Sequence, residues 1–135
     1  MSLRYLLDTN TVSYFIRRSS SALEKRMSLA MKNESAAIST LTRAELRYGQ
    51  ALMERQDKRS NVIDLLLQQL PHLAWTSEAA DHYSEIKSYL KLEGAPIGEL
   101  DTQIAAHALA EGFILVTHNT KHFVKIPHLK LEDWL

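Results

Sequence analysis

Three acidic side chains have the chemistry to form a metal site. Asp8 ends the apolar run at residues 3–7, Glu45 lies in a segment with helical spacing, and Asp101 follows the glycine–proline loop at residues 93–98. Carboxylate oxygens suit Mg²⁺ or Mn²⁺, and the absence of cysteine removes thiolate ligation of zinc. If the three carboxylates meet in one crevice, their mutual repulsion requires a cation.

Such a site would favour hydrolysis of a phosphodiester, because a bound metal stabilises developing negative charge and supplies an activated water. We expect Asp8 and Asp101 to ligate the metal directly. Glu45 is expected to hold a metal-bound water or to assist its deprotonation, so it would ligate partly through water. Each acid also has an ordinary structural explanation: Asp8 and Asp101 as helix caps, and Glu45 as a solvated side chain.

Three polar residues are expected to support these acids. Asn10 and Thr117 would orient the carboxylates by hydrogen bonds, as groups behind metal ligands commonly do. Asn119 is expected to contact a water or a phosphate rather than the metal.

The elements that must position these residues alternate between apolar runs and helical patterns. This order predicts an α/β fold, with a central, mainly parallel sheet of four to five strands between helices. Ser39 or Thr40 is expected to cap one helix and Ser77 another, and residues 41, 44, 48 and 52 are expected to share the apolar face of one helix. Expected strands are 3–7, 36–40, 72–75 and 113–117, and expected helices 12–16, 23–31, 41–52, 59–70, 77–90 and 101–109.

The carboxyl ends of parallel strands form the functional edge of such a sheet. Asp8 and Thr117 each end an expected strand, and Asp101 begins an expected helix after a loop. We therefore expect these three polar clusters to meet at one edge of the sheet.

Length and composition restrict the remaining possibilities. The 135 residues predict one domain over 1–135, and 45% hydrophobic residues with four glycines and three prolines indicate a packed globular chain. No signal peptide or membrane span is recognisable, so a cytoplasmic protein is expected. Sixteen basic residues balance sixteen acidic ones, which leaves the partner open.

The segments "LLDTN", "TRAELRYG", "GAPIGELDTQIAAHALAEGFILVTHNTKHF" and "LEDWL" together resemble the PIN domain of VapC-type toxins over essentially the whole chain. The resemblance implies a metal-dependent endoribonuclease that uses Mg²⁺, with Mn²⁺ possible. It also implies an inhibitory antitoxin of the VapB type and a homodimer. Details of "PIGELDTQIAAHA" and "VTHNT" resemble the enterobacterial group, which implies initiator tRNA, cut in the anticodon stem-loop, as the substrate.

One position departs from the family pattern. Relatives commonly have a fourth acidic residue a few positions after "VT.N", and this chain has His122 there. A neutral imidazole can still ligate a metal and suits Mn²⁺ better than Mg²⁺. His122 is therefore a candidate ligand, with a surface histidine beside Phe123 as the alternative.

Contacts with RNA and with the antitoxin are less defined by the sequence. Residues 23–70 form a candidate antitoxin surface, or else simply core. Basic residues that could rim the crevice, and tyrosines that could stack on a base, are Arg17, Arg18, Arg43, Arg47, Lys121, Lys125, Tyr14 and Tyr48.

Two other functions fit parts of the pattern. A catalytically degenerate PIN module would bind RNA or protein without cutting it, as the missing fourth acid suggests. A receiver-like phospho-acceptor domain also has an Asp at a strand end, but the position of Glu45 within a helix fits it poorly.

Overall fold

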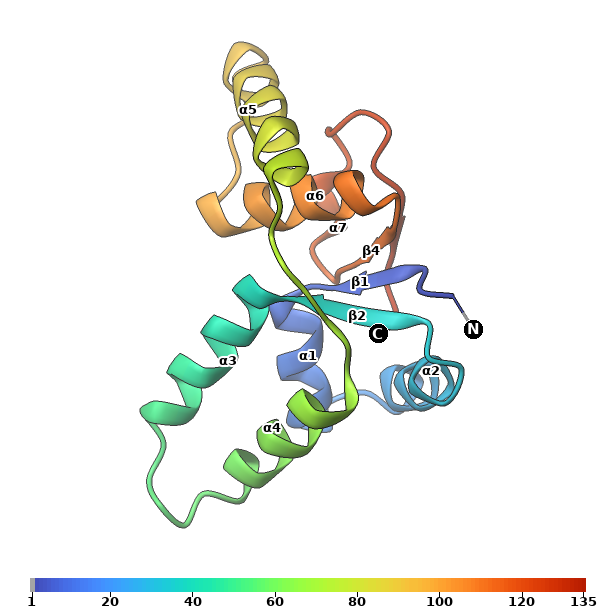
Figure 1. The fold of residues 1–135 in the computed structure, drawn as a ribbon, viewed down its shortest axis with the longest axis vertical. Helices are drawn as coiled ribbons and strands as arrows, with labels where there is room; N and C mark the ends of the chain where they lie inside the picture. Colours follow the sequence, from blue (N-terminus) through green and yellow to red (C-terminus); the bar gives the residue numbers. More distant parts are fainter. Residues whose placement is uncertain (1) are drawn as a thin grey trace.

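The computed structural model describes residues 2–135, and the one remaining residue of the predicted 1–135 domain, Met1, lies outside them. A five-stranded parallel sheet in the order β3-β2-β1-β4-β5 forms the centre (Figure 1). The strands are β1 (Tyr5–Leu7), β2 (Ala36–Ser39), β3 (His72–Leu73), β4 (Ile114–Val116) and β5 (Leu131–Glu132). The predicted fold class and strand number are confirmed.

The helices pack in two layers on the sheet. One layer contains α1, α2, α3 and α4, and the other contains α5 and α6, with the short α7 beside β4 (Figure 1). Their bounds are α1 (Thr9–Ile16), α2 (Ser21–Lys32), α3 (Thr40–Ala51), α4 (Lys58–Gln69), α5 (Ser77–Leu92), α6 (Glu99–Glu111) and α7 (Thr120–Phe123). Over residues 2–135, no helix combines the length and apolar character that crossing a membrane would demand.

The central strand β1 divides the core in two. Successive side chains of a strand point to opposite faces, so Leu7 packs under α1–α4 while Leu6 packs under α5, α6 and α7. Both leucines are completely buried. The sheet edge that carries Asp8 is therefore held by two separate cores.

The predicted helices are all present, but two local expectations are wrong. The N-cap of α5 is Thr76 rather than Ser77, and α6 begins at Glu99, two residues before Asp101. Ser39 caps α3 as expected, by accepting a hydrogen bond from the Leu41 amide at 3.0 Å.

The apolar residues predicted to share one face of α3 are only partly covered by the rest of the protein. The buried residues of α3 are Thr42 and Leu46, whereas Tyr48 and Leu52 are 68% and 70% exposed. The apolar face predicted from residues 41, 44, 48 and 52 is therefore largely exposed. A periodic stripe does not distinguish a face that meets the core from one that remains uncovered.

We expect Leu6→Ala to destabilise the fold by about 2–5 kcal/mol, because it empties a fully buried position under α6. Denaturant unfolding at 25 °C measures the change. Leu92→Ala removes the same atoms from a side chain that is 88% exposed, and should change stability by no more than about 0.5 kcal/mol. Equal effects in the two variants would contradict the assignment of Leu6 to the core.

Candidate active site

Asp8 is fixed at the carboxyl edge of the sheet by the first turn of α1. Its Oδ1 accepts a hydrogen bond from the Thr11 amide at 2.8 Å, and its own amide donates to the Val116 carbonyl at 3.1 Å. The residue is only 4% exposed. Asp8 is thus a helix cap, in agreement with its ordinary structural explanation. Its second carboxylate oxygen, Oδ2, accepts no hydrogen bond from residues 2–135.

Asp101 lies in the first turn of α6 and is close enough to the other two acids to sense their charges. Burial raises the pKa of its carboxyl above the usual range, and the negative charges of Asp8 and Glu45 raise it further, while His122 opposes them. The structure therefore brings the three predicted acids into one electrostatic neighbourhood. A shift caused by like charges is typical of a functional carboxylate cluster.

Glu45 reaches this neighbourhood from α3 and is exposed. It lines a cavity of about 330 Å³ together with Asn10 and Arg17. The cavity runs between α1, α3 and α4, so it gives solvent and ligands access to the acid.

His122 lies on α7, with its Nδ1 3.9 Å from Oδ2 of Asp101. The position at which the family resemblance implies a fourth acid therefore lies beside Asp101, although the imidazole is about half exposed. An imidazole here partly offsets the charge of Asp101, whereas a fourth carboxylate would add to the repulsion.

The three supporting residues lie near the site without touching the acids. Thr117 is fully buried at the end of β4, and its hydroxyl accepts a hydrogen bond from the Asn119 amide at 3.0 Å. Asn10 and Asn119 are both exposed. Within the described chain, neither Asn10 nor Thr117 donates a side-chain hydrogen bond to a carboxylate, so their orienting roles stay predictions.

Two threonines that the sequence analysis missed hold the helices of the site together. The Thr9 hydroxyl donates to the hydroxyl of buried Thr42 at 3.1 Å, which joins α1 to α3 one turn before Glu45. The Thr11 hydroxyl donates to the Val116 carbonyl at 3.2 Å. A threonine at a core position of a helical pattern was the available signal, because a buried hydroxyl needs a partner.

The donor set suits a hard divalent cation. Over residues 2–135, no three His, Asp or Glu side chains are gathered in a way that could hold a metal ion. Mg²⁺, however, usually binds through one or two carboxylates and keeps several waters. Burial and, after it, the charges of Asp8 and Glu45 raise the pKa of Asp101, and a bound cation would offset both, so the residues fit the group chemically.

Comparisons with known proteins identify the family of the chain. The PIN domain family model matches residues 5–129. "Ribonuclease VapC2" of Rickettsia felis is 35% identical over 96% of this chain and 97% of its own. "tRNA(fMet)-specific endonuclease VapC" of Salmonella typhimurium is 32% identical over 98% of both chains.

Solved structures give the same result. The chain superposes on VapBC2 from Rickettsia felis bound to a promoter DNA fragment with a TM-score of 0.88, at 34% identity and full coverage of both chains. The DNA-bound VapBC from Salmonella typhimurium gives 0.89 at 32% identity, over 98% of this chain and 99% of the other. The chain therefore belongs to the PIN-domain family and, within it, to the VapC ribonucleases.

We expect Asp101→Asn to raise the melting temperature in EDTA at pH 7. A carboxyl with a raised folded-state pKa loses stability as the pH rises through its titration range, so the penalty is fully present at neutral pH. The increase in melting temperature should become smaller as the pH falls toward 3.8, the usual pKa of an Asp carboxyl. Thermal melts across this range measure it.

The matched control is Asp81→Asn on α5, an exposed acid, which should leave the melting temperature nearly unchanged. A lower melting temperature for Asp101→Asn at pH 7 would contradict the crowding of charge at this site.

Proposed function

We propose that this chain is the toxin of a toxin–antitoxin pair and acts as a metal-dependent endoribonuclease. The observation that carries the proposal is the position of Asp101, half-buried and near enough to Asp8 and Glu45 that their charges add to the effect of burial in raising the pKa of its carboxyl. Its similarity to proteins named as VapC ribonucleases supports RNA as the substrate. A receiver-like domain would not match the PIN family model over residues 5–129.

The proposed reaction is hydrolysis of a phosphodiester bond. Mg²⁺, or Mn²⁺ in its place, would supply charge stabilisation for the phosphate and lower the pKa of the attacking water. Asp8 and Asp101 would hold the ion, with Asp8 fixed by its cap to Thr11. Glu45, exposed at the cavity, would accept the proton of the water, and exposed Asn119 would contact the phosphate.

For the substrate, we propose initiator tRNA cut in its anticodon stem-loop. The support is the relative from Salmonella typhimurium, whose name specifies tRNA(fMet). Hairpin loops expose unstacked bases and a bent backbone, which an open crevice can admit. A tRNA substrate places the activity in the cytoplasm.

The proposed partner is an inhibitory antitoxin of the VapB type. Several structural neighbours are VapBC complexes. Within residues 23–70, the exposed Tyr48 and Leu52 and the cavity beside Glu45 offer an apolar surface next to the acids. An antitoxin lying there could direct a basic side chain toward the carboxylates, and we further propose that the toxin forms a homodimer.

We expect Asp8→Asn to reduce cleavage of tRNA on the order of 1,000-fold, because one metal-holding charge is lost. Activity of the parent should require Mg²⁺ or Mn²⁺ and disappear with EDTA. Gel analysis of purified tRNA, with end sequencing of the fragments, gives the rate and the cut position.

Glu85→Gln, which removes an exposed acid on α5, should cleave like the parent. RNA binding by the parent without any cutting would instead favour the degenerate PIN module that His122 suggests. Metal-independent cutting would contradict the proposed mechanism.

We expect His122→Asp to increase affinity for Mn²⁺ and Mg²⁺ by about tenfold, because it adds a carboxylate facing Asp101. The preference of the parent for Mn²⁺ over Mg²⁺ should diminish in the variant. Isothermal titration of each metal, alongside cleavage rates, measures both effects. Unchanged metal affinity and activity would exclude position 122 from the site and leave it a surface histidine.

A further inference from the structure

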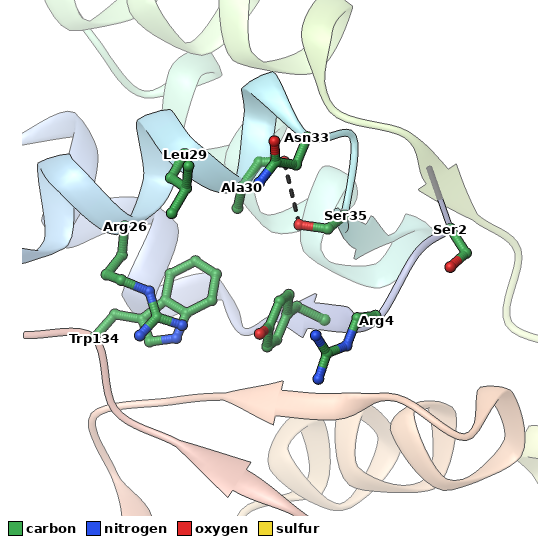
Figure 2. Close-up of a pocket in the computed structure, with 9 residues that line it drawn as sticks. Ser2, Arg4, Arg26, Leu29, Ala30, Asn33, Ser35 and Trp134 are labelled. Atoms are coloured by element: carbon green, nitrogen blue, oxygen red, sulfur yellow. Dashed lines mark hydrogen bonds between the residues drawn. The ribbon is translucent and has the colours of Figure 1, made fainter.

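A second cavity lies at the opposite, amino edge of the sheet. Its volume is about 480 Å³, and it opens between α2 and the residues that lead into β1 and β2 (Figure 2). Arg4 and Ser35 precede these strands and are joined by a hydrogen bond from the Arg4 amide to the Ser35 carbonyl at 2.8 Å. None of the proposed catalytic residues lines this cavity.

Four side chains form a row along the cavity, with a guanidinium at each end and two rings between. The Arg26 Cζ lies 4.6 Å from the centroid of the Trp134 ring, and the Tyr5 and Trp134 centroids are 5.1 Å apart, edge to face. The Arg4 Cζ lies 5.4 Å from the Tyr5 centroid. Figure 2 shows Arg4 and Arg26 at opposite ends of the row.

The guanidinium at one end of this row is already paired with a carboxylate, and within the described chain the guanidinium at the other end is not. Arg26 donates to Oε1 of Glu132 at 2.9 Å, and the Trp134 indole N–H donates to the same oxygen at 2.9 Å. Among residues 2–135, Arg4 forms no ion pair. The paired end therefore holds Trp134 in place, while the Arg4 guanidinium retains its full charge for a ligand.

The lining is cationic and polar rather than simply apolar. No acidic residue of the described chain lines the cavity, although the chain as a whole carries equal numbers of acidic and basic residues. The Asn33 side chain lines it and forms no hydrogen bond within residues 2–135, and the Ser35 hydroxyl makes only a long one, 3.4 Å to the Ala30 carbonyl. A ligand with an anionic group, a flat ring and polar ring edges would satisfy all of these groups.

We propose that this cavity binds one nucleotide unit of an RNA chain. Arg4 pairs with the phosphate, the base packs beside the Tyr5 ring, and Asn33 and Ser35 hydrogen-bond its edge. The identity of the RNA as substrate rests on the proposed function. A three-residue strand spans only about 10 Å, so one RNA molecule can contact both this cavity and the carboxylates at the other edge.

The test uses Trp134 as its own reporter. The chain has two tryptophans, so Trp75→Phe leaves Trp134 as the one indole in the protein. In this background, with Asp8→Asn and EDTA to prevent cutting, the emission of Trp134 is followed during titration with AMP, with CMP, with inorganic phosphate and with tRNA. We expect saturable changes with the mononucleotides, tighter ones with tRNA, and none with phosphate alone.

Arg4→Gln should weaken tRNA binding about tenfold and reduce the slope of log affinity against log salt by about 1. Arg4→Lys should recover part of the affinity because it restores the charge. The matched control is Lys91→Gln, an exposed cation on α5 in the other helical layer, which should leave both quantities unchanged. Thermal melts verify that each variant is folded.

The proposal is overturned if neither mononucleotide changes the emission of Trp134. It is also overturned if Arg4→Gln and Lys91→Gln change tRNA binding equally. A response to free mononucleotides but not to tRNA would identify a small-molecule site and also overturn it. A response to an acidic peptide with none to nucleotides would indicate a protein ligand instead. Since cutting by the Asp8-containing parent is measured separately, failure here is distinguishable from failure of the proposed function.

Discussion

Burial of an acid among other acids at the carboxyl edge is the constraint that the surrounding structure must accommodate. Burial and the charges of Asp8 and Glu45 together disfavour ionisation of Asp101. The backbone around these acids is nevertheless held firmly. The two cores that meet on β1, and the hydroxyl contacts of Thr9 and Thr11 with α3 and β4, provide that restraint.

The three acids differ in how firmly the fold fixes them. Asp8 is buried and used as a cap, Asp101 is half-buried, and Glu45 is exposed on α3. These differences in burial match the proposed roles of the three acids. Metal ligands benefit from a rigid position, whereas a proton acceptor must reach solvent. His122 on α7 lies beside Asp101 and acts to lower the pKa of that carboxyl, against the effect of the other acids.

Much of this arrangement could be predicted from the sequence because strong local signals coincided. An apolar run ending in Asp8, and another ending in Thr117, indicate two strand ends, and parallel pairing brings such ends to one edge. The strand β5 was missed because two residues carry no periodicity, and it forms only by pairing with β4. The exposure of Tyr48 and Leu52 on α3 could not be predicted, because exposed apolar residues can have the same spacing as core residues.

The division of Leu6 and Leu7 between the two cores also bears on how the chain can misfold. A slip of β1 by one residue against β2 and β4 would exchange the two leucines between the helical layers and withdraw Asp8 from the edge. The same error would thus disrupt packing and abolish the acid cluster together. A chain with a mispaired β1 would therefore lose packing and, on the proposed function, would also lose the carboxylate proposed to hold the metal.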